Sequence, residues 1–348
     1  MNRETVFNEI KDGKMAGVYL FIGQEEYEKK EAVEALRKAI LPEGLEALNE
    51  TVFDSADALQ IIESAETIPV MCDKRLVLVR DWPPLMKAGK SDRDGEKAEP
   101  VENDDSVKRL LAWMGNAPDT CVTVFFVHGD GPVRKSMKDA FDKMGRTVSF
   151  DPLSDAELSK WLRDRLKPYK KTIRAEAVNE LTFLAGRELT RLNAEVEKLA
   201  AYTRDEKEIT VEDIRAAVVP DVEASIFRMI DALVAKDAVK AYAICNAMLD
   251  AGEIVTNIVS MLVRQMRMMT QVKLLLDDKI VRYEEIASRM GENPYAVKMT
   301  IPQCNKIPAK KLLAAYKKSV EIEFEMKKGN RQDKEALDQL MLLFHLIL

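Results

Sequence analysis

The sequence predicts an α/β domain with a largely parallel sheet, followed by a small helical domain and an all-helical C-terminal domain. Three observations support this prediction. Short apolar runs alternate with helical segments between residues 17 and 127, as in parallel strands joined by helices. After Ser154 the chain becomes almost wholly helical in its pattern. The length of 348 residues also exceeds what one ordinary hydrophobic core supports, so two or three domains are expected.

The first domain opens with a strand at residues 17–22, a short β-rich apolar run that ends at Gly23. A helix follows from Glu25 to Ile40 and stops before Pro42. The other expected elements are a strand at 50–53, a helix at 56–66, a strand at 75–80, a helix around 107–114 and an apolar strand at 121–127.

The helical part begins at Ser154, which is a good N-cap. Its best-patterned helix carries apolar or aromatic residues spaced by three or four, and Thr210 can cap the helix after it. Pro220 marks another boundary, so we predict domains at 1–151, 152–219 and 220–348. The residues of the best-patterned helix are Leu189, Leu192, Val196, Leu199 and Tyr202.

The segment between Trp82 and Ser106 is polar and has no periodicity, which predicts a mobile surface loop to which we assign no function. The run from Leu340 to Leu348 is the most apolar of the chain. It is too short to span a bilayer, so it is expected to close a helical core or form a subunit contact.

Composition argues against several classes of function. The formal net charge is −6, so any DNA contact must be local. The four cysteines lie far apart and only two histidines exist, which disfavours a metal site and leaves few choices for a general base. The charged N-terminus and the lack of a long apolar run predict a cytoplasmic protein without membrane contact.

The turn after the first strand is laid out like that of an ATPase but lacks a phosphate loop. Such a loop reads G-x-x-x-x-G-K-S/T, because its glycines let backbone N–H groups wrap the phosphates. Here Gly23 stands alone, and Gln24, Glu25 and Glu26 follow it, so two carboxylates would repel a triphosphate. The apolar strand that should end in Asp-Glu runs into residues 127–130, Val-His-Gly-Asp. We therefore expect no ATP hydrolysis, no catalytic residue, no cofactor and no metal.

Several segments together resemble the delta-subunit family of bacterial DNA polymerase III clamp loaders, which are AAA+-like proteins without a working nucleotide site. The resemblance spans nearly the whole chain and rests on the order and spacing of the segments. One departure is Glu188, where the family usually has Asp. The segments are residues 18–27, residues 68–79, the helix from Arg187 to Leu199, Ile226-Phe227 and residues 291–298.

The resemblance implies an AAA+-like first domain, a lid domain and a collar domain, in a loader of five subunits that opens the sliding clamp during DNA replication. Its partners would be the clamp (beta subunit), the ATP-hydrolysing gamma or tau subunits, delta-prime, and primer-template DNA through the assembled loader. The sibling subunits carry a zinc-binding cysteine cluster and a Ser-Arg-Cys arginine finger, and this sequence has neither.

The resemblance also implies that apolar residues at the end of a first-domain helix contact the clamp. They map onto Val70 and Met71, with Ile68 beside them. The alternative is that these residues form core, because Val, Ile and Met between a helix and a strand are usually buried. In favour of contact, Pro69 stiffens the approach and Met adapts to an apolar pocket.

A DNA-binding regulator is the main alternative, because Ala287, Gly291 and Val297 fall at the offsets of a helix-turn-helix. The helix that would read the bases, Pro294 to Thr300, offers no Arg for guanine, so base readout would be poor.

The last domain has a basic stretch between Lys306 and Arg331, where eight Lys or Arg stand against three Glu, a net charge of +5. The simple interpretation is a solvated helix face. Lys327, Lys328 and Arg331 are nevertheless possible DNA contacts within a loader. The pattern predicts a buried stripe of Leu313, Tyr316, Val320 and Phe324.

Overall fold

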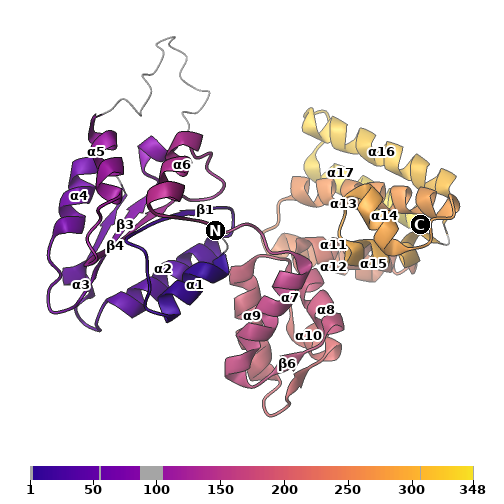
Figure 1. Cartoon of the computed structure of the whole chain (residues 1–348). Coiled ribbons are helices and arrows are strands. Elements are labelled where there is room, and N and C mark those ends of the chain that lie inside the picture. The colour runs from indigo at the N-terminus through magenta and orange to yellow at the C-terminus, as the bar shows by residue number, and fades with distance from the viewer. Residues whose placement is uncertain (1–2, 55, 87–104, 306, 348) are drawn as a thin grey trace, which may run out of the picture. The chain divides into compact units, whose positions relative to one another are not determined.

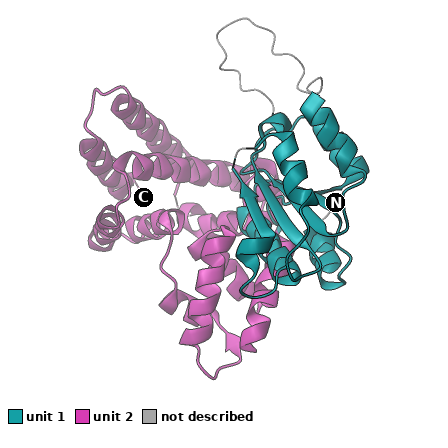
Figure 2. Cartoon of the chain, turned by 90° about the vertical axis from the view of Figure 1, so that its left-hand side faces the viewer, with its two compact units in different colours: residues 1–154 teal, residues 155–348 magenta. Residues whose placement is uncertain are grey.

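The computed structural model describes residues 3–54, 56–86, 105–305 and 307–347. The chain divides into two compact units, residues 1–154 and 155–348 (Figures 1 and 2). The first unit is an α/β structure and the second is helical, as predicted. The further division of the second unit at residues 219–220 stays a prediction.

A five-stranded parallel sheet forms the centre of the first unit, with strand order β2-β3-β4-β1-β5. Its strands are β1 (Val18–Ile22), β2 (Glu50–Phe53), β3 (Arg75–Arg80), β4 (Cys121–Phe126) and β5 (Arg146–Ser149). The helices are α1 (Arg3–Lys11), α2 (Glu26–Ile40), α3 (Glu46–Asn49), α4 (Ala58–Glu66), α5 (Asp105–Met114) and α6 (Lys135–Met144), and a 3₁₀ turn, η1, covers Pro83–Leu85.

Helices cover both faces of this sheet. Along β1, Tyr19 and Phe21 pack on one face with residues of α1 and α2, while Val18 and Leu20 pack on the other with residues of α4, α5 and α6. Because both faces are covered, β1, β3 and β4 are apolar on both sides, which is typical of parallel sheets.

The predicted strands and helices of this unit are all present, with bounds that differ by two residues or fewer. The prediction missed α1, α3, α6 and β5. Strand β5 has only four residues, and α6 buries only Met137 and Phe141 among many Lys and Asp, so both segments contain few apolar residues. Most of the loop expected at 82–106 lies outside the described residues. The described start of that segment is packed, since Trp82 and Leu85 are buried.

The second unit begins with α7 (Asp155–Leu166), η3 (Lys167–Tyr169), β6 (Thr172–Ile173), α8 (Ala175–Ala185), α9 (Leu189–Tyr202), β7 (Glu208–Ile209) and α10 (Val211–Ala217). The short strands β6 and β7 pair in parallel. Thr210 caps α10 as predicted: its side chain accepts a hydrogen bond from the Asp213 N–H, and the Asp213 carboxylate accepts one from the Thr210 N–H.

The rest of this unit packs around the long helix α13, whose Ile258, Leu262, Met266 and Met269 are fully buried. None of the helices within the described ranges is both long enough and apolar enough to cross a bilayer. The helices are α11 (Val222–Val234), α12 (Ala238–Asp250), α13 (Val255–Asp277), α14 (Tyr283–Met290), α15 (Pro294–Asn305), α16 (Ala309–Lys327) and α17 (Asp333–Ile347).

The buried face of α16 differs from the predicted one. Leu313, Val320 and Phe324 are exposed, Phe324 by 53%. The buried residues of this helix are Leu312, Ala315, Ser319, Ile322 and Met326. The prediction followed the larger apolar side chains, whereas α16 packs against α13 and α17 with a face that includes two small residues. The Ser319 hydroxyl donates to the Ala315 carbonyl oxygen at 2.7 Å, so this polar side chain is satisfied inside the core.

We predict that Leu312→Ala and Leu313→Ala have different effects although they are adjacent and chemically identical. Leu312 is fully buried, so its truncation should lower the free energy of unfolding by about 2 to 5 kcal/mol. Leu313 is exposed, so Leu313→Ala should lower the free energy of unfolding by less than about 0.5 kcal/mol. Urea unfolding of both variants measures the difference, and equal losses would contradict the assigned face.

Candidate functional site

The turn between β1 and α2 is three residues long and lies against the chain that leaves β5. Gly23 has φ +107°, and a Cβ atom there would lie 2.4 Å from the Phe150 carbonyl oxygen. Only glycine tolerates this approach. The Glu25 N–H donates to the same carbonyl oxygen at 2.9 Å, so this amide already has a partner within the chain.

Lys29 stands six residues after Gly23, which is the spacing of the lysine in a phosphate loop. The flanking residues are Glu28 and Lys30, where the motif has Gly and Ser or Thr. Helix α2 already begins at Glu26, so Glu26 and Tyr27 are helical where a phosphate loop is still open, two residues before the position of its second glycine.

The Lys29 ammonium group is fully buried and has partners from its own chain. It donates to Glu26 Oε1 and to the Val127 carbonyl oxygen, both at 2.6 Å, and it lies 5.0 Å from the centre of the Phe126 ring. A buried ammonium ion requires such compensation. In a phosphate loop the compensating charge comes from the nucleotide, and here it comes from Glu26.

Glu26 links this lysine to the chain after β4. Its Oε1 also accepts from the Gly129 N–H at 2.7 Å. Burial raises the pKa of this carboxyl, but hydrogen bonds from Lys29 and Gly129 outweigh burial and leave the pKa below its usual 4.5. Glu26 is therefore held ionised. The prediction from sequence missed this pairing, because it considered only the repulsion between Glu26 and phosphate.

Two more polar pairs complete this corner. His128 contacts Asp81 twice: its N–H donates to Oδ1 at 2.8 Å, and its ring Nδ1 lies 2.7 Å from Oδ2. The Gln24 side chain donates to Asp130 at 3.1 Å. Over the described ranges, His, Cys, Asp and Glu side chains form no group of three or more that could hold a metal ion. The corner is therefore a set of internal pairs.

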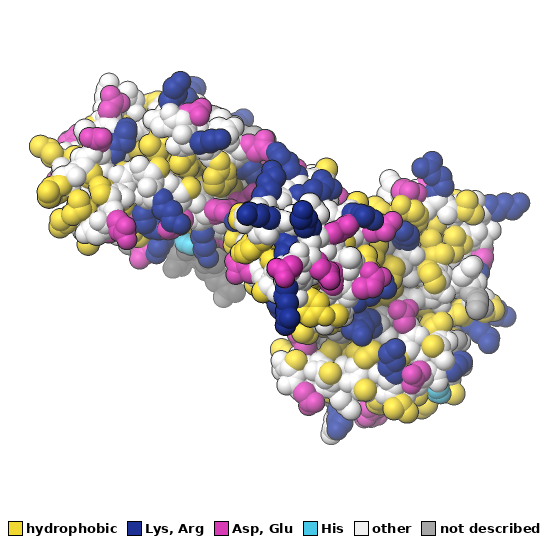
Figure 3. Space-filling view, turned by 90° about the horizontal axis from the view of Figure 1, so that it is seen from below, with side chains coloured by type: hydrophobic (Ala, Val, Ile, Leu, Met, Phe, Trp, Pro, Cys, Tyr) yellow, Lys and Arg dark blue, Asp and Glu magenta, His cyan; other side chains and the backbone are white. Residues whose placement is uncertain are grey.

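The predicted clamp-binding residues lie on the loop between α4 and β3, at the amino edge of the sheet. Ile68 is 82% exposed, Met71 is 84% exposed and Val70 is 43% exposed. Because all three side chains are exposed, they are not part of the core. We call residues 68–71 the apolar tip. Figure 3 shows hydrophobic side chains gathered at the left-hand end of the first unit, the end at which α3 lies.

The apolar tip is held by neighbouring side chains. The Asn49 carboxamide bonds to the backbone of Val70, and Arg75 donates to the Thr67 carbonyl oxygen at 3.4 Å and to the Thr51 hydroxyl at 2.9 Å. Strands β2 and β3 are paired with Glu50 opposite Leu76, so the residues just before both strands lie together. The sequence prediction missed Asn49, because a lone Asn before a short strand carries no signal.

The predicted DNA contacts lie together in the turn between α16 and α17, and each already has a partner. Lys327 pairs with Glu323 at 2.7 Å, Lys328 lies 4.3 Å from the centre of the Phe324 ring, and Arg331 lies 3.9 Å from Glu335. In both ion pairs one partner is more than half exposed, and ion pairs that reach solvent in this way contribute little to stability.

The helix-turn-helix positions have structural roles. Ala287 and Val297 are buried in the core of the second unit, and Gly291 ends α14 with φ +67°. Helix α15 packs against α13, and its Thr300 and Gln303 are buried. Core packing and the end of α14 therefore account for the spacing of Ala287, Gly291 and Val297.

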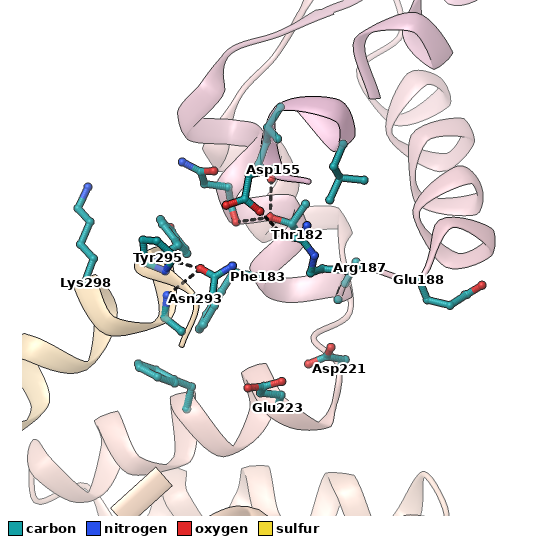
Figure 4. A pocket seen from close by; sticks show the side chains of 18 of the residues that line it. Asp155, Thr182, Phe183, Arg187, Glu188, Asp221, Glu223, Asn293, Tyr295 and Lys298 are labelled. Carbon is teal, nitrogen blue, oxygen red and sulfur yellow. Dashed lines mark hydrogen bonds and ion pairs between the residues drawn. The ribbon is translucent and has the colours of Figure 1, made fainter. Parts of the chain in front are cut away.

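A cavity of about 650 Å³ lies within the second unit, lined by residues of α7, α8, α9, α11 and α15 among others (Figure 4). Several of its charged side chains serve the ends of helices. Glu188 caps α9, Asp221 caps α11, and Arg187 pairs with Asp155. These groups support the local structure, so we assign the cavity no ligand.

Comparisons with known proteins give one consistent result. The family model described as DNA polymerase III, delta subunit, matches residues 19–151, and the model of its C-terminal domain matches residues 223–344. DNA polymerase III subunit delta of Bacillus subtilis (strain 168) is 27% identical over 97% of this chain and 95% of its own length. The solved structure of the Bacillus subtilis DNA clamp loader delta protein covers 99% of both chains with a TM-score of 0.60 and 24% identity, and it supports the fold.

We predict that Glu26→Gln lowers the free energy of unfolding by about 2 kcal/mol at neutral pH, because it leaves the buried Lys29 without a counter-charge. The loss is smaller than for a fully buried pair, since the Glu26 side chain is 34% exposed. Glu43→Gln, at an exposed position, is the control.

The same substitution has a pH signature. Because folding lowers the pKa of Glu26, its contribution is fully present above pH 4.5 and is lost as the pH falls through the lowered pKa. Urea unfolding of parent and Glu26→Gln should therefore converge as the pH falls below 4.5. A difference that does not depend on pH would contradict the pairing.

Proposed function

The chain belongs to the DNA polymerase III delta subunit family and is a clamp-loader subunit, and from this premise we propose that it binds the sliding clamp through the apolar tip. Binding helps to open the clamp ring for loading onto primed DNA. The observation that carries this proposal is the exposure of Ile68, Val70 and Met71 on a loop whose backbone is held in place.

The chemistry of the apolar tip suits a protein partner with an apolar pocket. Exposed apolar side chains that cluster on one loop are typical of contact surfaces. A few such residues usually carry most of the binding free energy of an interface. The Met71 side chain is unbranched and adapts to the shape of a pocket, which suits its place at the end of the loop.

We also propose that the chain does not hydrolyse ATP. The Glu25 N–H already donates to Phe150, and Lys29 already pairs with Glu26, so two groups at this corner that could otherwise hold phosphate are in use. The ATP-hydrolysing gamma or tau subunits and delta-prime are then its partners in the loader. The same assignment makes the protein cytoplasmic and its role independent of any membrane.

The exposed apolar residues of the last helices suit a contact with a neighbouring loader subunit. Val320 and Phe324 on α16, and Leu342 and Leu346 on α17, are all at least 40% exposed. Leu340, Met341 and Phe344 of the same terminal run are buried, so α17 serves the core with one face and leaves apolar side chains on another.

Primer-template DNA is the fourth proposed partner. The turn between α16 and α17 places Lys327, Lys328 and Arg331 within five residues of one another, and their present partners are weak. Lysine and arginine in such a turn bind phosphate without reading sequence.

We predict that the double substitution Val70→Glu with Met71→Glu weakens binding to the purified sliding clamp by about 100-fold or more, because two central apolar contacts are replaced by charges. Binding is measured by titration without nucleotide, since the proposal gives the chain no need of ATP. The fold should be retained, because Met71 is exposed and Val70 is partly exposed.

Val281→Glu is the matched control, because Val281 is 74% exposed in the second unit and should bind the clamp as the parent does. Unchanged affinity of the double variant would remove the apolar tip from the interface. A strict requirement for ATP in the parent would contradict the proposal that Glu25 and Lys29 are already occupied by partners within the chain.

We predict that changing Lys327, Lys328 and Arg331 to Ala makes the salt dependence of DNA binding by the assembled loader less steep by about 2 to 3 units of log affinity per log salt, since each lost phosphate contact retains one counterion. Arg163, Lys170 and Lys207 are exposed cations elsewhere in the second unit, and their triple Ala variant is the control for charge. An unaltered slope would place the DNA elsewhere.

A further inference from the structure

One buried side chain outside the apolar tip bonds to the middle of it. Asn49 is the last residue of α3 and is fully buried. Its Oδ1 accepts from the Val70 N–H at 2.7 Å, and its Nδ2 donates to the Val70 carbonyl oxygen at 3.0 Å and to the Leu45 carbonyl oxygen at 3.1 Å. One carboxamide thus ties the apolar tip to the first unit.

This contact resembles the pairing between two strands, confined to a single residue. Within the described ranges, Asn49 is the one hydrogen-bond partner of both backbone polar groups of Val70. The carboxamide has a donor and an acceptor on one short arm, which is what a peptide group requires. An aspartate would lack the donor, and a serine would not reach both groups.

The backbone next to this contact is strained. Met71 has φ +56°, a left-handed conformation that an unbranched L-residue rarely adopts outside turns. Such a conformation persists where the surrounding structure imposes it, and it is frequent at binding sites. Because the side chains of Ile68 and Met71 extend into solvent, their direction depends on the peptide groups around Val70.

The two anchors of the segment differ in kind. Arg75 holds Thr67 through a long bond of 3.4 Å and also bonds to Thr51, so it fixes where the loop begins. Asn49 fixes the orientation of the peptide groups between the exposed side chains. Removing Asn49 would leave the loop attached at both ends but free to turn in the middle.

We propose that Asn49 is a positioning residue for clamp binding, which holds the backbone of Val70 so that Ile68 and Met71 are presented in one conformation. This inference rests on the proposed function of the apolar tip. A surface that is ordered before binding loses less conformational freedom when the partner arrives, so order in the loop raises affinity without any contact between Asn49 and the clamp.

The test is Asn49→Ala in the full chain, with Asn8→Ala as the matched control, because Asn8 is exposed on α1. We expect the affinity of folded Asn49→Ala for the purified clamp to fall about tenfold, since two hydrogen bonds that order the loop are lost. Amide hydrogen exchange should become faster at Val70, whose N–H donates to Asn49, and remain slow at Val77 in β3. Thermal unfolding gives the folded fraction at the temperature of the assay.

Unchanged affinity per folded molecule would overturn the inference, because a residue with only a structural role would lower stability without changing how the folded chain binds. If Asn49→Ala does not fold, amide hydrogen exchange in the parent chain tests the inference instead. The Val70 amide should then exchange as slowly as a strand amide, and exchange at the rate of an unbonded loop amide would overturn the inference.

The variant with Val70→Glu and Met71→Glu separates this inference from the proposed function. If the double variant loses clamp binding and Asn49→Ala binds the clamp as tightly as the parent does, only the positioning role of Asn49 is wrong. Parental binding by both variants sinks the apolar tip as the clamp contact and the positioning role with it.

Discussion

The first unit depends on one constraint: its sheet is parallel and is covered by helices on both faces. Strands of such a sheet have no polar side, so polar and functional side chains collect where strands begin and end. The polar pairs around Glu26, Lys29 and His128 lie at the carboxyl edge, after β1, β3 and β4. The apolar tip lies at the amino edge, before β3. The two regions are thus separated by the length of the strands. Substitutions in one region can therefore leave the residues of the other in place.

The sequence was sufficient for those parts of the fold that depend on local pattern. The strands β1, β3 and β4 are continuous apolar runs, and the capping box at Thr210 depends on residues only three positions apart. The failure at α16 has a physical reason. Burial there is decided by how closely α13 approaches, so Ala315 and Ser319 face inward while Phe324 stays outside. A pattern of hydrophobicity contains no information on that distance.

The candidate sites were predictable to the same limited extent. Exposure of Ile68, Val70 and Met71 was anticipated through the family resemblance, whereas composition alone favoured burial. The roles of Asn49 and Lys29 depend on partners that are 21 and 98 residues away in the chain. Such contacts follow from strand register and from the path of the chain after β4, which a single sequence does not reveal.

The backbone at Gly23 also limits what substitutions near this turn can achieve. Replacing Glu28 by Gly and Lys30 by Ser would restore the letters of a phosphate loop without restoring the loop, because Glu26 and Tyr27, which precede these positions, already lie within α2. For the chain to surround a phosphate, the first turn of α2 would have to unwind. The three-residue turn before it would also have to move away from Phe150. Substitutions that recreate the motif are therefore insufficient in this geometry, and phosphate binding at this turn would need a rearrangement of the main chain.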